Sequence, residues 1–506
     1  MDSLIGNLLV LIPLSLFFIG ALKMRRTFNK TQSNPSISPG PWKLPIIGNT
    51  LHLITSAPHQ KLRELANIYG PLMHLQLGEI ITIVVSSPEY AKEVMKTHDV
   101  IFAFRPQNLA SDILSYESTY IISAPYGNYW RQLRKICTVE LFTQKCVKSF
   151  KPIREEELNN LVKMIDSHKG SAINLTEAVL LSIYNIISRA AFGMKCKDQE
   201  FISVIKEAVS LTAGFNRAEL FPSTKWLQHV TGFKPKLEKL HRQLDQILED
   251  IIDEHKGTKP KAKKEGEGEA EEYLVDMLLK FQDTDADICL TNNSIKTILL
   301  DVFGAGGETS ATTINWAMAE MLRDLRAMKK AQVEVREVFA MRGWVDEIHI
   351  NELKYLKLVI KETLRLHPPA PLLLPRECGQ TCEIDGYHIP VKSKVLVNAW
   401  AIGRDPMYWT EPEKFYPERF IDSSIDYKGS NFEYIPFGAG RRIGPGSTLG
   451  LINVELTLAF LLYHFDWKLP NEMKAEDFDM SEKFGVTVER KDDLYLIPIT
   501  SHPVKL

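Results

Sequence analysis

A long run of helical patterning constrains the fold of this 506-residue chain more than any other feature. From about Trp130 to Leu366, apolar residues recur at the three- and four-residue spacing of amphipathic helices, and no linker divides the run. The pattern of a β-hairpin lies on either side of the run, in "LMHLQLGEIITIVV" before it and in "EIDGYHIPVKSKVLVNAW" after it. A last helix around Leu451 to His464 and a last strand in "DDLYLIPI" follow. The sequence therefore predicts one large, mainly α domain with a minor β region.

The N-terminal segment indicates a membrane anchor. The stretch from Leu4 to Leu22 is almost uncharged and about long enough to cross a bilayer. Lys23, Arg25 and Arg26 follow it directly, so the positive-inside rule places the rest of the chain in the cytosol. A cleaved signal peptide is the alternative, but the apolar run is long for one and no small-residue cleavage site follows. We therefore expect a retained anchor.

The next segment is predicted to be a stiff linker. The stretch "NPSISPGPWKLP" contains four prolines, which exclude a helix and favour extended backbone. We divide the chain into an anchor (1–24), a basic and proline-rich linker (25–45) and a main domain (46–506).

Composition excludes several classes of protein. The formal net charge of -2 argues against a nucleic-acid-binding protein, which would usually be basic. The six cysteines lack the spacing of a disulfide framework or a zinc site. The closest pair, Cys378 and Cys382, is followed by no second pair, so reduced thiols in the cytosol are expected. The low-complexity stretch from Lys256 to Glu272 is predicted to be a surface loop.

The segment "DVFGAGGETSATTINWAMAEML" combines a helical pattern with an unusual cost. It holds three glycines, Gly304, Gly306 and Gly307. Each costs about 1 kcal/mol within a helix, so the helix is expected to lie close to something bulky or to be locally opened. The Thr309 hydroxyl can bond back to the Ala305 carbonyl, and Glu308 beside it could relay protons. The alternative is a helix-packing site with a solvated glutamate.

Two further motifs pair charged side chains. In "KETLRLHPP", Glu362 and Arg365 lie three residues apart and can pair, and Arg419 in "YPERF" could complete a Glu–Arg–Arg cluster. In "NYWRQLRKIC", Trp130 and Arg134 lie four apart on one helix face. The second pair is either an amphipathic surface or a clamp for a carboxylate.

The loop "FGAGRRIGPG" places two arginines among four glycines. Arg442 could bind an acidic group, and the glycines would let the backbone approach a flat ligand. There is no side chain at Gly444, the centre of the loop.

In this order and at these separations, the motifs resemble the cytochrome P-450 family of haem-thiolate monooxygenases. The resemblance covers essentially the whole chain, anchor and proline linker included. It is closest to the microsomal plant enzymes of specialised metabolism, whose motifs are similar to "HPPAPLLLPREC", "NAWAIGRDP", "YPERF", "PFGAGRR" and "LLYHFDWKLP". The resemblance implies the cytochrome P-450 fold, with residues 46–506 as a haem-binding monooxygenase-type domain.

The resemblance also implies roles for individual residues. The positions that hold the haem propionates match Trp130, Arg134, Arg376 and Arg442. The oxygen-binding groove and its proton relay match Ala305, Gly306, Glu308 and Thr309. Phe437 matches the aromatic residue beside the haem ligand, and Glu362, Arg365 and Arg419 match a structural triad. The substrate-pocket positions match Leu109, Ile113, Ala370, Leu373 and Val486.

At Gly444 the family places the cysteine whose thiolate binds iron. That thiolate pushes electron density onto the iron and favours O–O cleavage, so its loss removes the central step of the chemistry. Glycine tolerates any backbone conformation, so the loop is expected to fold. Haem b is then expected to bind weakly and without a thiolate ligand, and this chain is expected to be an impaired monooxygenase.

The pocket segments are largely apolar and imply a neutral, hydrophobic substrate. A terpenoid is the first expectation, and a flavonoid, other phenolic or alkaloid the second. The resemblance implies electrons from NADPH through a flavoprotein reductase, contact with membrane lipid, and a single-pass position in the endoplasmic reticulum membrane. Two other functions stay open: a non-catalytic haem- or ligand-binding paralogue, and a non-oxidative isomerase or cyclase that uses Glu308 or Thr309.

Overall fold

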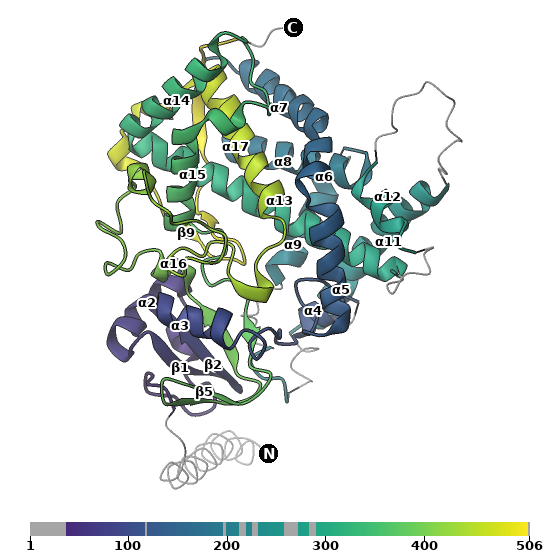
Figure 1. Ribbon diagram of the computed structural model, residues 1–506, viewed down its shortest axis with the longest axis vertical. Coiled ribbons are helices and arrows are strands. Elements are labelled where there is room, and N and C mark those ends of the chain that lie inside the picture. The colour runs from purple at the N-terminus through teal and green to yellow at the C-terminus, as the bar shows by residue number, and fades with distance from the viewer. Residues whose placement is uncertain are drawn as a thin grey trace, which may run out of the picture.

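The computed structural model describes residues 37–116, 119–195, 199–211, 219–224, 231–257, 272–282 and 290–503. The predicted anchor (1–24) and all but the two ends of the predicted surface loop lie outside these residues. The described chain forms a large helical body and a smaller lobe that contains most of the strands (Figure 1).

The helical body forms where the sequence has its three- and four-residue apolar spacing. The longer helices are α7 (Lys151–Asp166), α8 (Leu175–Phe192), α9 (Gln199–Leu211), α11 (Phe233–Gly257), α13 (Asn292–Arg323), α14 (Leu325–Ala340), α15 (Lys354–Leu366) and α17 (Ser447–His464). The shorter helices are α2 (Pro58–Tyr69), α3 (Pro88–Lys92), α4 (Leu109–Leu114), α5 (Asn128–Ile136), α6 (Gln144–Ser149), α12 (Leu274–Leu279) and α16 (Ala399–Ile402).

Helix α13 runs through the middle of the body and is buried along almost its whole length (Figure 1). Its first turn is capped by Thr291, whose hydroxyl accepts a hydrogen bond from the Ser294 amide at 3.1 Å. Phe303 on this helix lies within 5.1 Å of the Tyr184 ring and 5.0 Å of the Phe201 ring, measured between centroids. These aromatic contacts fix α13 against α8 and α9 in the core of the body.

The main sheet has the strand order β1–β2–β7–β4. Its strands are β1 (Leu72–Leu77), β2 (Ile80–Val85), β7 (Lys394–Val397) and β4 (Arg376–Glu377). The other sheets contain β3 (Ile173–Asn174), β11 (Tyr495–Thr500) and β8 (Phe465–Lys468), then β5 (Cys382–Ile384) with β6 (Tyr387–Ile389), and β9 (Glu482–Lys483) with β10 (Glu489–Arg490). In the main sheet β1 and β2 form an antiparallel hairpin, and β7 adds to β2 in parallel.

The predicted fold class is confirmed, since the described chain is mainly α with small sheets. The early hairpin and the last strand lie where the sequence predicts them, and the last helix begins slightly earlier than expected. The segment "EIDGYHIPVKSKVLVNAW" forms not one hairpin but two units, because β7 leaves β5 and β6 to join β2.

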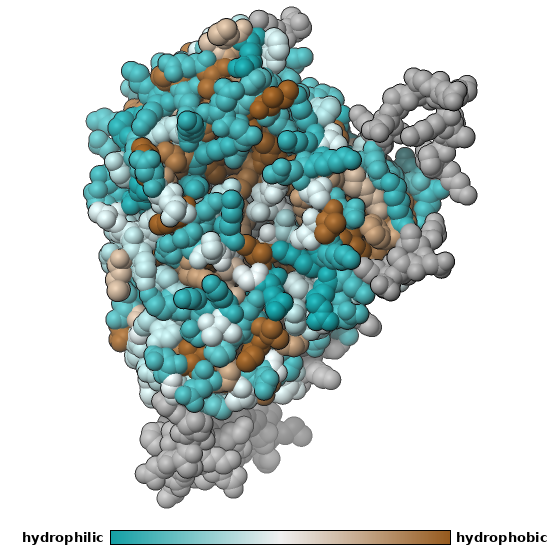
Figure 2. Space-filling view, viewed as in Figure 1, coloured by the Kyte–Doolittle hydropathy of each residue, from teal (hydrophilic) through white to brown (hydrophobic). Residues whose placement is uncertain are grey.

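Two described helices, α8 and α17, are long and apolar enough to span a membrane, but 67% and 72% of their apolar windows lie buried inside the protein. They are core helices of the body. On the face shown in Figure 2, hydrophobic residues are scattered among hydrophilic ones, as on the surface of a water-exposed domain.

Candidate functional site

The glycines of α13 allow a neighbouring helix to approach closely. A Cβ at Gly307 would lie 2.5 Å from the Tyr184 ring, and one at Gly306 would lie 3.1 Å from Ile187. Both neighbours belong to α8. The cost of these two glycines in the helix is therefore explained by packing, which is one of the two expectations from the sequence.

Beyond these glycines, α13 has a polar notch. The Thr309 hydroxyl donates a hydrogen bond to the Ala305 carbonyl at 2.6 Å, as the sequence predicts. Glu308 is not a solvated surface residue, since only 7% of it is exposed. Burial raises the pKa of its carboxyl to about 7, and Glu489 adds to this shift, while Lys206 and Thr487 oppose it. A carboxyl with such a pKa can both accept and release a proton near neutral pH.

Thr309 and Glu308 have different neighbours, although the Glu308 carboxyl also bonds to Thr487, which lines the same cavity as Thr309. Thr309 and Ala305 line an internal cavity of about 300 Å³, together with Thr487. Glu308 instead lies near the charged groups Lys206 and Glu489, which line a separate polar cleft of about 250 Å³. The two residues thus stand between a polar cleft and a largely apolar cavity.

The cavity is lined by α13, by parts of α4, α9 and α11, by the main sheet, and by the segments that precede β4 and β10. Of the predicted pocket residues, Ala370 and Val486 line it, whereas Leu109, Ile113 and Leu373 are not among its lining residues. Leu109 and Ile113 pack against the main core. The neighbouring residues Ser111, Leu114 and Leu374 line the cavity in their place.

Four arginines gather beside this cavity. Arg442 donates to the carbonyls of Ala103 and Ala124 at 2.7 and 2.5 Å, and its guanidinium lies 4.4 Å from the centre of the Trp130 ring. Arg376 donates to the Ala439 carbonyl at 2.8 Å. The other two arginines also bind backbone carbonyls, Arg134 that of Ile443, and Arg105 those of Leu374 and Pro375.

Among the described residues, the charges of these four arginines are only partly balanced. Burial, with the nearby charges of Arg376 and Arg134, lowers the pKa of Arg442 to about 9. Desolvation, with Arg442 and Arg376, holds the pKa of Arg105 well below its usual value. Asp99 lies 3.4 Å from Arg376, the one carboxylate paired with the buried arginines of this cluster in the described chain. The cluster would be relieved by an anion, and its several donors suit a ligand with more than one carboxylate.

The glycine-rich loop (437–446) contacts the arginine cluster, since Arg376 and Arg134 bind the carbonyls of Ala439 and Ile443. It continues through a short helical turn, Gly440–Arg442, to the start of α17. The Gly444 amide donates to the Phe437 carbonyl at 3.0 Å. A Cβ at Gly444 would meet only the Phe437 carbonyl oxygen at 3.7 Å and the Phe437 Cβ at 4.0 Å, apart from its chain neighbours.

Comparisons with known proteins identify the family of the chain. The Cytochrome P450 family model matches residues 38–496. The chain belongs to the cytochrome P450 family. It is 60% identical to Cytochrome P450 71D11 from Lotus japonicus over 490 aligned residues. The aligned residues cover 96% of this chain and 99% of that protein. It is 50% identical to premnaspirodiene oxygenase from Hyoscyamus muticus, over 97% of this chain and 98% of that protein.

A solved zebra fish cytochrome P450, in a structure with abiraterone, superposes with a TM-score of 0.73 at 26% identity, over 88% of this chain and all of the other. The expected fold and family are therefore confirmed. By family the chain is an oxidoreductase of the monooxygenase class, with plant relatives of specialised metabolism, and the family uses haem and electrons from a reductase.

The described residues of this cytochrome P450 chain fit the propionates of a haem group, but they do not offer a ligand for its iron. The clustered guanidinium groups of Arg134, Arg376 and Arg442 would suit the two propionates of haem. At Gly444 there is no side chain to reach the metal, and the described residues contain no group of three or more His, Cys, Asp or Glu that could hold a metal ion.

The loop distinguishes glycines that are needed from one that is not. We expect Gly440→Ala to destabilise the protein by at least about 2 kcal/mol, because Gly440 has a φ of 68° and a Cβ there would lie 2.1 Å from the Met95 carbonyl oxygen. Gly444→Ala should be neutral or stabilise slightly, since nothing opposes its Cβ. Urea unfolding followed by tryptophan fluorescence measures both, and equal effects would contradict this interpretation.

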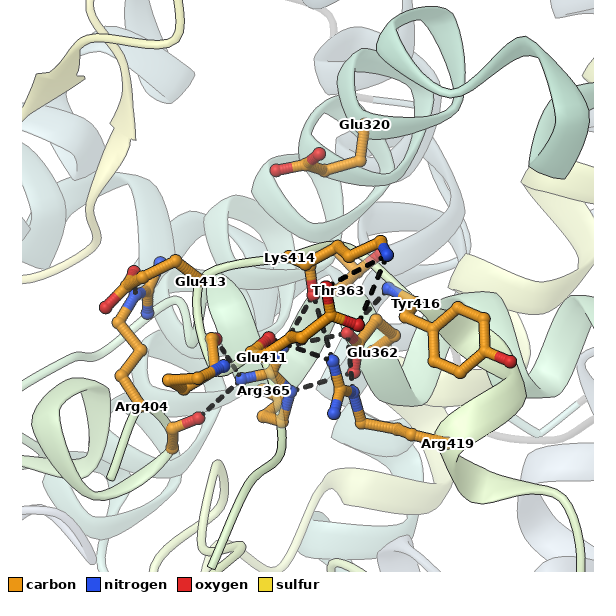
Figure 3. A network of polar contacts seen from close by, with 12 residues as sticks. Glu320, Glu362, Thr363, Arg365, Arg404, Glu411, Glu413, Lys414, Tyr416 and Arg419 are labelled. Atoms are coloured by element: carbon orange, nitrogen blue, oxygen red, sulfur yellow. Dashed lines mark hydrogen bonds and ion pairs between the residues drawn. The ribbon is translucent and has the colours of Figure 1, made fainter. Parts of the chain in front are cut away.

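Figure 3 shows that the three residues of the predicted triad come together, and none of them lines the cavity. Glu362 accepts two hydrogen bonds from Arg365, each 2.8 Å long, and one from Arg419 at 2.9 Å. The arginines in turn bind backbone carbonyls of an irregular segment, residues 403–419. Arg365, for example, binds those of Gly403 and Pro412. The cluster pins this segment to α15.

Some site residues were missed by the sequence analysis. Arg105 and Asp99 belong to the charged cluster, yet neither lies in a motif whose spacing reveals it. Thr487 lines the cavity beside the predicted Val486. Glu219 and Lys394 line the same cavity, although they are 175 positions apart in the printed sequence.

Proposed function

We propose that this chain is a plant monooxygenase scaffold for a hydrophobic specialised metabolite whose haem iron lacks its thiolate ligand. The observation that carries the proposal is the contrast between the gathered arginines and the empty side-chain position at Gly444. Arg134, Arg376 and Arg442 would hold the propionates, with Trp130 packed under Arg442. Phe437 would lie beside the iron-binding position.

Bound through a thiolate, haem supplies oxygen activation with electrons from NADPH through a reductase. The chain's own contribution is to position the substrate and move protons. Glu308 would take protons from the polar cleft, and the Thr309 hydroxyl would donate within the cavity. Gly306 and Ala305 would give close approach to the helix at this point.

A terpenoid is the first candidate for the substrate. The cavity lining is rich in apolar side chains, including Leu114, Ile122, Ile205 and Leu300. The name of one similar enzyme, premnaspirodiene oxygenase, supports a terpenoid skeleton. Flavonoids, other phenolics and alkaloids are the second candidates.

The unmodified chain tests the proposal. Purified protein should be partly depleted of haem, because affinity rests on apolar enclosure and the arginines alone. The haem that it retains should lack thiolate-type absorption in the reduced carbon monoxide complex, which a difference spectrum measures. A full thiolate-type spectrum would show that another cysteine binds the iron and would refute the proposal.

We also propose a single-pass position in the endoplasmic reticulum membrane, from the apolar stretch at residues 4–22 and the basic cluster after it. The full chain should stay in the pellet on carbonate extraction of microsomes. Deletion of residues 1–26 should release much of it. A fully soluble, unprocessed full-length chain would contradict the anchor (1–24). In this proposal the anchor is followed by a linker (25–45) and the haem domain (46–506).

Gly444 also favours a second candidate, a haem- or ligand-binding paralogue without oxygenase activity. The variant Gly444→Cys distinguishes the two candidate functions, since a monooxygenase that lost only its iron ligand should regain activity.

A further inference from the structure

The lining of the cavity is largely apolar but includes a group of polar side chains from the main sheet and the segment beside it. Thr82 on β2, Lys394 on β7 and Glu219 all line the cavity. We call these three residues the sheet-end cluster. Thr82 and Lys394 are register neighbours in the parallel pair of strands β2 and β7. Glu219 is close enough to Lys394 for the charge of each to act on the pKa of the other.

Glu219 is held in place by the main sheet. The next residue, Leu220, accepts a hydrogen bond from the Glu79 amide at 2.9 Å through its carbonyl, and its side chain is buried. One carboxylate oxygen of Glu219 accepts from the Ala110 amide at 3.3 Å. The carboxyl group is therefore fixed at the cavity wall and does not swing into solvent.

Two oxygens of the sheet-end cluster are unsatisfied. The second carboxylate oxygen of Glu219 and the hydroxyl of Thr82 are buried and have no hydrogen-bond partner among the described residues. Thr82 is fully buried. A buried polar atom without a partner costs about 1–3 kcal/mol, so both atoms would gain from a ligand that can bond to them.

The charges of the cluster select the kind of ligand. Glu219 and Lys394 have opposite charges and lie close together, so a carboxylate or an ammonium ligand would be attracted by one of them and repelled by the other, with little net gain. A hydrocarbon would leave both oxygens unsatisfied. A neutral hydroxyl can donate to the free oxygen of Glu219 and accept from the Thr82 hydroxyl, so it matches the cluster in both roles.

We propose that the substrate of this cavity already carries a neutral hydroxyl, which the sheet-end cluster binds. A different part of the cavity wall is formed by α13, where Ala305 and Thr309 lie. The carbon presented to that wall is then remote from the hydroxyl. The reaction that supplies the substrate must therefore be one that installs a hydroxyl, either an earlier oxygenation or the capture of water. This rests on the proposed function only in taking the cavity as the substrate site.

Binding of matched probes tests the proposal without turnover. The full-length chain in lipid nanodiscs is titrated by calorimetry with 1-adamantanol, 1-fluoroadamantane, 1-adamantylamine and adamantane-1-carboxylate. These share one apolar skeleton and differ only in the polar group. 1-Adamantanol should bind about 10-fold or more tightly than each of the others, which is the effect of one hydrogen bond to a charged group.

Two variants test whether Glu219 and Thr82 cause the preference for the alcohol. Glu219→Leu should bring the affinities for the alcohol and the fluoride within about twofold of each other, and Thr82→Val, which keeps the side-chain shape, should reduce the preference severalfold. The matched control is Glu337→Gln, an exposed position on α14 outside the cavity, which should keep the full preference.

Equal affinity for alcohol and fluoride in the unmodified chain, tightest binding of the amine, or no binding of any probe would overturn the proposal. So would a preference that survives both Glu219→Leu and Thr82→Val. Failure of the proposed function is seen separately, because the iron-ligand spectrum of Gly444→Cys is measured without any substrate.

Discussion

Gly444→Cys is expected to give a protein with full haem content, thiolate-type absorption in the reduced carbon monoxide complex, and NADPH-dependent oxygenation. The structure leaves room for the change, since a Cβ at this position would meet no atom closer than 3.7 Å outside its chain neighbours. Its backbone does not need glycine, since its φ is not positive, and the arginines proposed to bind the propionates and the proposed Glu308–Thr309 relay are present in the structure. Product formation should rise by at least about 100-fold, or about 2.7 kcal/mol of barrier.

Gly444→Ala and Gly444→Ser are the matched controls. Both add a Cβ without a thiolate, so both should keep the spectrum and the low activity of the unmodified chain. Spectra and product formation with NADPH and reductase are measured over a panel of terpenoids and phenolics. If the unmodified chain already oxygenates a substrate, another residue binds the haem iron in place of the missing cysteine. If Gly444→Cys gains the spectrum but forms no product, the chain has a second defect or a non-oxidative role.

Features that depend on local chemistry could be predicted from the sequence. The bond from Thr309 to Ala305 follows from a threonine four residues after a carbonyl on one helix, and the Glu362–Arg365 pair follows from a three-residue spacing. The β1–β2 hairpin follows from alternating residues around Gly78. In each case the interacting groups are close in the chain.

Features that depend on packing between distant segments could not be predicted. Helix α4 has only six residues with apolar side chains on several sides, so its periodicity does not decide whether Leu109 and Ile113 or Ser111 and Leu114 face the cavity. Glu219 reaches the cavity because its segment binds the β1–β2 turn, a contact that no local pattern encodes. Arg105 in "FAFRP" carries no spacing that marks it as part of the arginine cluster.

Glu362→Leu is expected to destabilise the protein by about 3–5 kcal/mol, a large part of the 5–15 kcal/mol that stabilises a typical domain. The change removes the only carboxylate that pairs with Arg365 and Arg419 in the described chain, and it leaves the fully buried guanidinium of Arg365 without a counter-charge. The backbone amide of Tyr416, which donates to Glu362 at 2.8 Å, also loses its acceptor.

The matched control for this prediction lies in the same segment. Glu411 pairs with Lys414 at the surface, where their side chains are 62% and 57% exposed, so Glu411→Gln should cost at most about 1 kcal/mol. Urea unfolding of the two variants, followed by tryptophan fluorescence, measures the difference. A cost for Glu362→Leu no larger than that for Glu411→Gln would mean that the arginines hold the irregular segment through its carbonyls alone. The larger cost is expected because a single buried carboxylate holds both arginines in the geometry that those carbonyl contacts need.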